Sequence, residues 1–259
     1  MNSYSIYNDT VLMSGGSGRL GKRLVEQIDN LRLLAPSHRG LDISSYESVD
    51  SYFNRLDLKN IIFLNCAALV GETEARENPE LLYLTNVMGV QNVKRICLKY
   101  NCFLMQISSD YVFDGNRGSY SEKDYPHPVT QYGWSKLIGE EILCDMNHSL
   151  ILRMSFVDPE NLKFPKALVD QYSSRELISN ICEDIHMLLI AISKGVSLPK
   201  ILHIGAERRS QYEFYKTFRP DIMKKSLKDI PFKLPVDVSF DISLWKKTKP
   251  KLLKHIPSK

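Results

Sequence analysis

Short apolar runs alternate with longer amphipathic stretches along the first 150 residues of the chain. The apolar runs predict five strands, at Thr10–Ser14, Leu31–Ala35, Ile61–Asn65, Phe103–Ser108 and Leu150–Met154. Apolar positions at helical spacing predict helices between them, at Arg19–Asn30, Ser44–Leu56, Pro79–Tyr100 and Thr130–Asn147. Strands that are apolar on both faces and separated by helices indicate an α/β fold with a doubly wound parallel sheet.

The pattern is less regular after residue 155. It predicts a helix at Leu177–Ser193, a strand at Ile201–Ile204 and a short helix at Gln211–Phe218, before a tail rich in proline and lysine. We expect one domain over residues 1–154 and a small, shortened lobe with a basic tail over residues 155–259. In the second predicted helix, Ser44 is the expected N-cap and Glu47 occupies the capping-box position.

The composition is that of an ordinary globular protein. Of the 259 residues, 43% are hydrophobic and 25% are charged, and the formal net charge is +4. Much of the excess positive charge lies in the tail, at Lys246, Lys247, Lys249, Lys251, Lys254 and Lys259. This distribution predicts a solvated tail, since a nucleic-acid-binding face has basic residues spread among aromatic ones. The longest apolar runs are too short to cross a bilayer. We therefore expect neither nucleic acid nor a membrane as a partner.

The cysteines give information about the cellular compartment. The five cysteines form no CxxC pair and no Cys/His metal-ligand spacing, and they lie at Cys66, Cys97, Cys102, Cys144 and Cys182. No metal site is expected from them. An odd number of cysteines, without a visible secretory signal in the polar N-terminus, favours a reducing compartment. The sequence therefore predicts a cytoplasmic protein.

The first predicted strand leads directly into a glycine-rich turn that opens a helix. The turn reads Gly15-Gly16-Ser17-Gly18-Arg19-Leu20-Gly21. Glycines allow a tight turn and let backbone N–H groups approach a pyrophosphate at the helix N-terminus. The position between a strand and an amphipathic helix predicts a Rossmann-type dinucleotide site. In this turn, the expected cofactor contacts are Gly15, Ser17, Gly18, Arg19, Leu20 and Gly21.

The end of the second predicted strand bears on the choice of cofactor. Proteins that bind NAD usually place an acidic residue there, on the ribose 2′-hydroxyl. This chain has Ser37, His38 and Arg39 instead, which suit a 2′-phosphate that a carboxylate would repel. We expect NADP(H) as the cofactor, with NAD as the alternative. Asp42 and the neighbouring Ile43 are expected to flank the adenine.

Tyr132 and Lys136 are the candidate catalytic pair. They lie four residues apart on one predicted helix, so both side chains emerge on the same face. A phenol has a pKa near 10 and is a poor acid at neutral pH. A nearby ammonium favours the phenolate and lowers that pKa, which makes Tyr132 a usable general acid in carbonyl reduction. The alternative is an ordinary surface pair on a helix.

A serine after the fourth predicted strand strengthens this interpretation. Ser109 stands in the segment ISSDYVFDG, where a parallel sheet presents side chains at its carboxyl edge. Its hydroxyl can donate a hydrogen bond to the oxyanion that develops on a carbonyl substrate. The alternative role for such a serine is to cap a helix.

These motifs, taken in order, resemble those of the extended short-chain dehydrogenases, and among them the dTDP-4-dehydrorhamnose reductases. The resemblance is carried by GGSGRLG, LDISSYESV, NCAALVGETEARENPELLYLTNVMGV, ISSDYVFDG, YGWSKLIGEE and ILRMS, over residues 10 to 155. Weaker similarity follows in LVDQYSSRE, HIGAE and DVSFDISLWKKT.

The resemblance implies NADPH-dependent reduction of the C4 keto group of a nucleotide-activated 4-keto-6-deoxy sugar, in deoxysugar biosynthesis. It implies that Tyr132 donates the proton and that Lys136 binds the nicotinamide ribose. Ser109, Asp110 and Tyr111 are implied to line the sugar site. The remaining cofactor contacts that it implies are Ala67, Ala68 and Asn86. A homodimer is also implied.

The chain departs from the family pattern in two places. Between Arg153 and LVDQYSS the family inserts a further loop and helix, where this chain has only SFVDPENLKFPKA. That region helps to cover the sugar nucleotide, so we expect an open or altered substrate lobe, or one that a partner completes. Trp134 stands where the family has a small residue or arginine, and a packing role is expected for it.

Two other functions stay open. The regulatory subunit of methionine adenosyltransferase resembles this family, contains a very similar SSDYVFDG segment and keeps a dinucleotide site while it serves as a binding partner. A sugar-nucleotide epimerase is the second alternative. An epimerase needs a further acid/base pair beside the sugar, for which His127 is a candidate only by its position near Tyr132.

Overall fold

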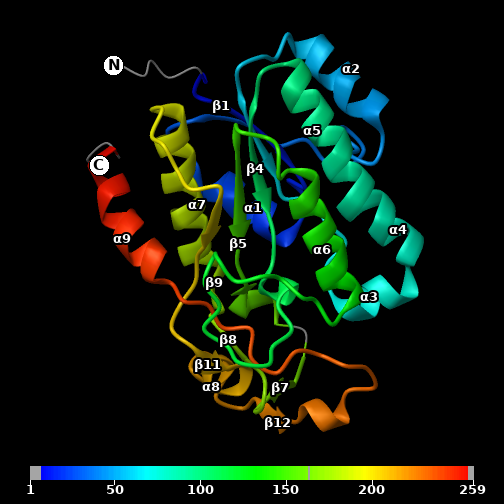
Figure 1. The fold of residues 1–259 in the computed structure, drawn as a ribbon, viewed down its shortest axis with the longest axis vertical. Coiled ribbons are helices and arrows are strands. Elements are labelled where there is room, and N and C mark those ends of the chain that lie inside the picture. The colour runs from blue at the N-terminus through cyan, green and yellow to red at the C-terminus, as the bar shows by residue number, and fades with distance from the viewer. Residues whose placement is uncertain (1–6, 163, 256–259) are drawn as a thin grey trace.

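A six-stranded parallel sheet forms the centre of the protein (Figure 1). The computed structural model describes residues 7–162 and 164–255. The strand order is β10-β5-β4-β3-β1-β2, which is the doubly wound arrangement that the sequence predicts. The strands are β1 (Thr10–Ser14), β2 (Arg32–Leu34), β3 (Ile62–Asn65), β4 (Phe103–Ile107), β5 (Ser149–Arg153) and β10 (Ile201–His203).

Helices cover both faces of this sheet. Helices α1 and α7 contact each other on one face, and α2, α5 and α6 form the other layer (Figure 1). The helices are α1 (Arg19–Gln27), α2 (Tyr46–Leu56), α4 (Pro79–Tyr83), α5 (Gly89–Lys99), α6 (Gln131–Ile142) and α7 (Ile178–Ser193). A π-helical turn over Leu84–Met88 joins α4 to α5, so the predicted long helix is continuous but locally widened.

The side chains of the central strands explain the unbroken apolar runs. In β1, Val11 and Met13 pack in the hydrophobic cluster that contains residues of α1 and α7. Leu12 points the other way, into the cluster that contains residues of α2 and α5. Successive residues of a strand face opposite sides of the sheet, so a strand covered on both sides needs apolar residues throughout.

Helix α2 begins one residue later than the sequence pattern predicted. Its N-cap is Ser45, whose Oγ accepts a hydrogen bond from the backbone N–H of Ser48. The predicted N-cap, Ser44, is wrong because its hydroxyl donates to Asp42 Oδ1 instead. The predicted capping box is also wrong. The third residue of the helix is Ser48, and Glu47 is the second.

Replacing the observed cap will weaken the protein modestly. We expect Ser45→Ala to lower the free energy of unfolding by about 1 kcal/mol, because the N–H of Ser48 loses its acceptor. Denaturant unfolding followed by circular dichroism measures the difference. Ser45→Asp, which restores an acceptor, will recover the loss. Equal stability of Ser45→Ala and the wild type would place the cap elsewhere.

A small lobe lies at the carboxyl end of the sheet (Figure 1). It is built from short strand pairs and one helix: β7 (Lys166–Leu168) with β12 (Met223–Lys225), β8 (Tyr172–Ser173) with β11 (Arg209–Ser210), β6 (Phe156–Val157) with β9 (Glu176–Leu177), and α8 (Gln211–Lys216). The segment after residue 154 also supplies α7 and β10 to the main body. The division of the chain at residue 154 stays a prediction.

The lysine-rich tail contains a helix that the sequence pattern did not predict. Helix α9 spans Ser243–Leu252, and its Trp245 and Leu252 are buried in the main core. Lys249 forms an ion pair with Asp184 of α7, with 2.6 Å between Nζ and Oδ1. Trp245 and Leu252 are the buried residues of α9, and they lie seven residues apart. Two apolar positions are too few to show a helical period in the sequence.

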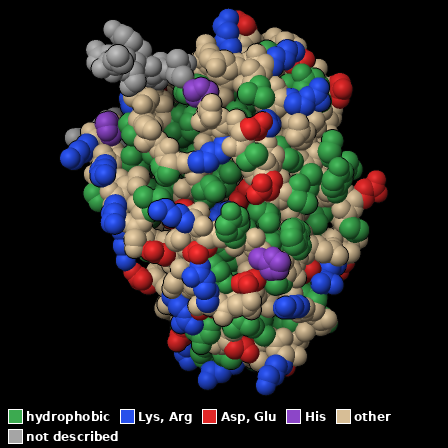
Figure 2. Space-filling view, viewed as in Figure 1, with side chains coloured by type: hydrophobic (Ala, Val, Ile, Leu, Met, Phe, Trp, Pro, Cys, Tyr) green, Lys and Arg blue, Asp and Glu red, His purple; other side chains and the backbone are tan. Residues whose placement is uncertain are grey.

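The surface carries charges of both signs. Figure 2 shows basic, acidic and hydrophobic side chains interspersed over one face of the molecule. No helix in the described part of the chain is long and apolar enough to cross a membrane.

Candidate active site

The glycine-rich turn after β1 is shaped by contacts that leave no room for side chains. Gly15 has a φ of +74°, in the left-handed region that favours glycine. A Cβ on Gly21 would lie 2.3 Å from the carbonyl oxygen of Gly15. Leu20 anchors the start of α1 in the core, while Gly18 at the N-cap offers no side chain to the free N–H groups. The helix N-terminus is therefore open to an anionic group.

A buried row of polar side chains fixes the strand ends beside this turn. Ser14 donates to Asn65 Oδ1 at 2.5 Å, and Asn65 donates to Gln106 Oε1 at 2.7 Å. The backbone N–H of Ala67 donates to Ser14 Oγ at 3.4 Å. These contacts join the carboxyl ends of β1, β3 and β4. They also hold the segment of Ala67 and Ala68 against Gly15, whose Cβ position lies 2.8 Å from the Ala67 nitrogen.

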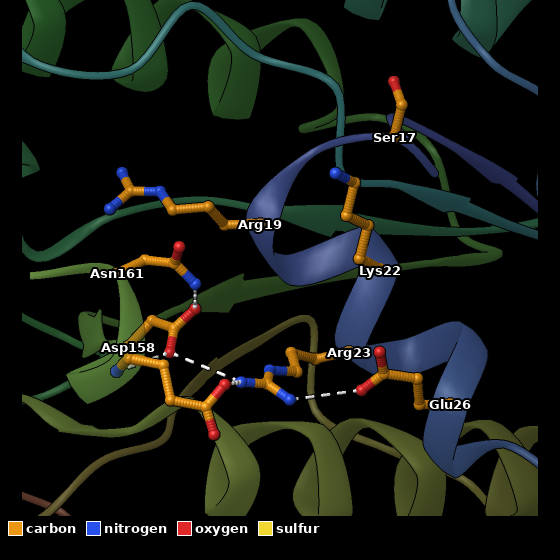
Figure 3. A pocket seen from close by; sticks show the side chains of 8 residues that line it. Ser17, Arg19, Lys22, Arg23, Glu26, Asp158 and Asn161 are labelled. Carbon is orange, nitrogen blue, oxygen red and sulfur yellow. Dashed lines mark hydrogen bonds and ion pairs between the residues drawn. The ribbon is translucent and has the colours of Figure 1, made fainter.

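A cavity of about 310 Å³ opens at the start of α1 (Figure 3). Ser17, Arg19 and Lys22 line it from the helix side. Asp158, Glu160 and Asn161 line it from the segment after β6. Arg23 connects the two sides through ion pairs with Asp158, at 3.7 Å, and with Glu160. Arg19 and Lys22 thus place two cations beside the glycine-rich turn.

The turn after β2 lies next to the glycine-rich turn. The carbonyl oxygen of Ala35 lies 2.8 Å from the position that a Cβ on Gly16 would occupy. The exposed residues that follow Ala35 are therefore close to the glycine-rich turn. Ser37, His38 and Arg39 are these residues, and all three are exposed.

The two residues predicted to flank the adenine have other contacts here. Asp42 accepts hydrogen bonds from the backbone and hydroxyl of Ser44 and stays partly exposed. Ile43 is buried, and the Cβ position of Gly89 lies 2.7 Å from its side chain.

Asn86 ties two parts of the site together. It lies in the π-helical turn, donates to the Leu69 carbonyl at 3.0 Å and accepts from the Leu69 N–H at 2.8 Å. Its amide also donates to Ser135 Oγ at 2.9 Å. Asn86 therefore connects the loop after β3 to α6. It contacts α6 at Ser135, the residue before Lys136. Its role as a cofactor contact stays a prediction.

Tyr132 stands beside Ser109, at the carboxyl end of β4. Burial raises the pKa of Tyr132 above its usual value near 10. The groups that lower this pKa most are the hydrogen-bonded hydroxyl of Ser109 and then the charge of Arg19. Lys136 lies one turn further along α6, and its Nζ reaches the carboxyl end of β4 at Ile107. The coupling of Tyr132 to Lys136 stays a prediction.

Lys136 is buried, with 5% of its surface exposed. Its Nζ donates to the Ile107 carbonyl at 2.7 Å. Burial lowers the pKa of Lys136 to about 8, opposed by the carboxylate of Glu140 one turn along the helix. The lysine is therefore a cation at neutral pH that loses its charge at moderately alkaline pH.

Asp110 and Tyr111 follow Ser109 and face the small lobe. Asp110 is 1% exposed, and its Oδ1 accepts a hydrogen bond from Ser109 at 3.1 Å. The Tyr111 hydroxyl accepts from Gln171 of the lobe at 3.0 Å, and its ring meets that of Tyr132 edge-on at 6.2 Å. Burial raises the pKa of Tyr111 to about 12, so it stays neutral at working pH.

Three residues near the site were not found from the sequence. Glu72 is buried in α3 (Glu72–Glu77) and accepts from the Tyr132 N–H at 3.0 Å, which fixes the start of α6. Glu140 lies four residues after Lys136, a spacing that could have drawn attention to it. Arg175 of the small lobe lowers the pKa of Asp110 through its charge, and no local pattern marks it.

Two further residues were singled out from the sequence. His127 is exposed and lies near the ring of Trp134, with 6.3 Å between centroids. Trp134 is 46% exposed. No cluster of three or more His, Cys, Asp or Glu side chains suited to a metal ion occurs within residues 7–162 and 164–255.

Comparison with solved structures identifies the fold. The dTDP-4-dehydrorhamnose reductase of Bacillus anthracis, solved in complex with NADP, has a TM-score of 0.82 and 22% sequence identity. The alignment covers 96% of this chain and 98% of that chain. At this identity the likeness concerns the fold, and it confirms the Rossmann-type architecture.

Two curated relatives differ in how much of their length is matched. The dTDP-4-dehydrorhamnose reductase of Aggregatibacter actinomycetemcomitans is 30% identical over 243 residues, which cover 85% of this chain and 82% of the relative. Methionine adenosyltransferase 2 subunit beta of Xenopus laevis is 36% identical over 99 residues, which cover 38% of this chain and 30% of that protein.

The family model described as the RmlD substrate binding domain matches residues 9–187. This range runs from the glycine-rich turn through the Ser109, Tyr132 and Lys136 cluster and into α7. The resemblance inferred from the ordered motifs is thereby confirmed: the chain belongs to the RmlD substrate binding domain family.

Proposed function

We propose that this protein is an NADPH-dependent reductase of the C4 keto group of a nucleotide-activated 4-keto-6-deoxy sugar. The observation that carries the proposal is the cluster of Ser109 and Tyr132 beside an open dinucleotide turn. The reductase of Aggregatibacter actinomycetemcomitans, matched over 82% of its length, supports the substrate class. The NADP in the Bacillus anthracis structure supports the cofactor.

The residues around the glycine-rich turn fit a dinucleotide. A Cβ on Gly15 or Gly21 would collide with backbone atoms, so the turn is tight and carries no side chains there. Its backbone N–H groups are then accessible to a ligand's phosphates. The uncapped start of α1 and the cation of Arg19 suit the negative charge of a pyrophosphate. NADPH, when bound, supplies the hydride for the reduction.

Ser109 and Tyr132 act on the carbonyl oxygen. The Ser109 hydroxyl donates its one proton to Asp110 Oδ1 in this structure. It turns to donate that proton to the substrate instead, where it stabilises the negative charge that develops on O4. Tyr132 gives its phenolic proton to that oxygen, so the ketone becomes a secondary alcohol and the tyrosine becomes a phenolate. Arg19, which lowers the pKa of Tyr132 through its charge, also stabilises this phenolate.

Lys136 is the proposed contact for the nicotinamide ribose. Its ammonium has three N–H donors, and the Ile107 carbonyl takes one of them. The remaining donors are free to bind two ribose hydroxyl groups. Glu140, behind it on α6, opposes the loss of its charge.

The pH dependence of NADPH binding follows from the pKa of Lys136. Because that pKa is lowered to about 8, the side chain is charged below this pH and neutral above it. We expect NADPH affinity to be constant near pH 7 and to fall as the pH rises through 8. Lys136→Met will bind more weakly and will lack this decline. Fluorescence titration of NADPH measures both, and a decline that Lys136→Met retains would assign it to another group.

Arg39 is expected to select NADPH over NADH. Its exposed side chain follows β2 next to the glycine-rich turn, where it can pair with a 2′-phosphate. Arg39→Ala will weaken NADPH binding about tenfold, since a charge-assisted contact contributes roughly 1.5 kcal/mol, and will leave NADH binding unchanged. Arg55→Ala on α2 is the matched control. Equal losses for both cofactors would contradict the assignment.

The test of the function is oxidation of NADPH by purified protein with dTDP- or UDP-4-keto-6-deoxyglucose. The assay is run alone and with a 3,5-epimerase added. Absorbance loss in proportion to product supports the reductase, whereas product without cofactor consumption indicates an epimerase. Dependence on the added epimerase identifies the 4-keto-rhamnose form as the substrate. Tight NADPH binding without oxidation of any of these sugars overturns the proposal for them.

A non-catalytic regulatory role is the second candidate. The similarity to methionine adenosyltransferase 2 subunit beta of Xenopus laevis, over 38% of this chain, favours it. Binding to a methionine adenosyltransferase catalytic subunit, measured by analytical ultracentrifugation with and without NADPH, distinguishes this role from the reductase.

The remaining partners and the location stay proposals. We propose a homodimer and a cytoplasmic location, the latter supported by five cysteines that are all free thiols.

A further inference from the structure

The backbone N–H of Tyr132 takes its acceptor from outside α6. The first N–H groups of a helix have no acceptor within the helix itself. Thr130, the N-cap of α6, accepts from the N–H of Gly133 at 3.0 Å through its Oγ1. The N–H of Tyr132, the second residue of the helix, donates instead to Glu72 Oε2 of α3, at 3.0 Å.

The carboxylate of Glu72 is fixed by a second donor. Glu72 is the first residue of α3 and is 6% exposed. Its Oε1 accepts from Arg76 Nε, one turn along the same helix, at 2.7 Å. A buried carboxylate is costly unless it is paired and hydrogen-bonded, and here each oxygen has its own donor. The orientation of Glu72 toward Tyr132 is therefore determined by Arg76.

Arg76 in turn packs against the small lobe. Its guanidinium carbon lies 5.0 Å from the centre of the Phe232 ring, which is the distance of a cation–π contact. Three residues further on, the carbonyl of Pro235 accepts from Gln171 Nε2 at 3.1 Å. The same amide nitrogen donates to the hydroxyl of Tyr111 at 3.0 Å. One segment of the lobe thus contacts the surroundings of the catalytic tyrosine in two places.

The backbone carbonyl of Tyr132 is held as well. It accepts from the Ser135 hydroxyl at 2.7 Å, and Asn86 donates to Ser135 Oγ at 2.9 Å. Side chains from three elements thus fix both polar groups of the Tyr132 backbone. A displacement of about 1 Å at a reacting group costs up to about a hundredfold in rate, so these contacts bear on the chemistry.

We propose that Glu72 is a positioning residue whose carboxylate, oriented by Arg76, holds Tyr132 where its phenol reaches the carbonyl oxygen of the substrate. The proposal rests on the reductase function proposed above. The negative charge lies at the N-terminal end of α6, where the helix dipole strengthens the contact. Glu72 acts through the backbone of Tyr132 and takes no part in the transfer of the proton.

Amide hydrogen exchange of the full chain tests the contact directly, without substrate. The chain is labelled with ¹⁵N-tyrosine, and the Tyr132 signal is identified by its loss in Tyr132→Phe. In Glu72→Met, which keeps the length of the side chain but has no acceptor oxygen, this amide will exchange at least about tenfold faster. Glu72→Gln, which keeps an acceptor oxygen, will restore most of the protection. Unchanged exchange in Glu72→Met overturns the proposal.

Glu77→Met is the matched control. Glu77 is an exposed glutamate at the end of the same helix, and its substitution will leave both the exchange and the rate at wild-type values. In Arg76→Met the exchange of the Tyr132 amide will lie between that of the wild type and that of Glu72→Met, and a wild-type value would overturn the part assigned to Arg76. If Glu72→Met does not fold, Glu72→Asp, which is one methylene shorter and draws the acceptor away, gives the same test.

Steady-state kinetics separates positioning from a general loss of structure, and this proposal from the reductase function. With rates referred to the concentration of NADPH-binding sites, kcat of Glu72→Met will fall at least about tenfold, while KM for the sugar stays within about threefold. Glu72→Gln will recover most of kcat. If the wild type oxidises no NADPH with any sugar while the exchange rises in Glu72→Met, the reductase function fails and the hold of Glu72 on Tyr132 stands. If the wild type is active and Glu72→Met keeps its kcat, this proposal alone fails.

Discussion

Tyr132→Phe will lower kcat for NADPH oxidation by about a thousandfold, because the substrate oxygen loses its proton donor. The phenyl ring keeps the packing against Tyr111, whose ring lies 6.2 Å away edge-on. The affinity for NADPH will change by less than about threefold, since the hydroxyl is assigned to the substrate oxygen. Stopped-flow absorbance of NADPH with saturating sugar measures the rate, and fluorescence titration measures the affinity.

Tyr125→Phe is the control for this substitution. Tyr125 is 93% exposed in the loop that precedes α6, so its hydroxyl has no part in the proposed chemistry. Its rate will equal that of the wild type. A Tyr132→Phe enzyme that keeps more than about a tenth of the wild-type kcat would assign the proton to another donor, because removal of a general acid costs at least about a hundredfold.

Glu140→Leu will lower the free energy of unfolding by about 3–5 kcal/mol, because Arg153 is left as a buried charge without a partner. Arg153 is 1% exposed, and its Nη2 lies 2.6 Å from Glu140 Oε2. Ser108 donates to the same carboxylate at 2.5 Å. The Arg153 Nη1 donates to His203 Nε2 at 3.3 Å. Burial lowers the pKa of His203 to about 3, so this histidine is a neutral acceptor that supplies no negative charge. Denaturant unfolding at pH 7 measures the loss.

The double variant Glu140→Leu/Arg153→Leu will be more stable than Glu140→Leu alone, because it removes the stranded charge as well. Glu207→Leu is the surface control. Glu207 pairs with Lys246, both are exposed, and the loss will be below about 1 kcal/mol. A Glu140→Leu protein as stable as Glu207→Leu would show that the buried pair contributes little.

The sequence alone was most informative about the sheet and the cofactor turn. β1 has the predicted bounds, and the other central strands differ from prediction by one residue at one end or at both. Their apolar runs are dictated by burial on both faces, which is a local property of each strand. The glycine-rich turn was equally visible, since its glycines stand together in the sequence between a strand and a helix. The ends of helices were less visible, as Ser44 and Ser45 show, because neighbouring serines compete for one cap.

The sequence could not identify contacts between segments that lie far apart along the chain. Ser109 and Tyr132 were both singled out, yet the influence of Arg19 on Tyr132 arises only because α1 and α6 both begin at the carboxyl edge of the sheet. Arg175 comes from a lobe of short strand pairs whose positions no periodicity marks.

Local periodicity and turn chemistry thus determined the doubly wound sheet, the dinucleotide turn and the candidate Tyr132 and Lys136 pair. The tertiary structure alone decided which charges surround these residues: Glu72 at the start of α6 and Glu140 behind Lys136. The physical reason is that helix and strand patterns depend on neighbours a few residues away. The ionisation of a buried group depends on every charge that folding brings within a few ångströms.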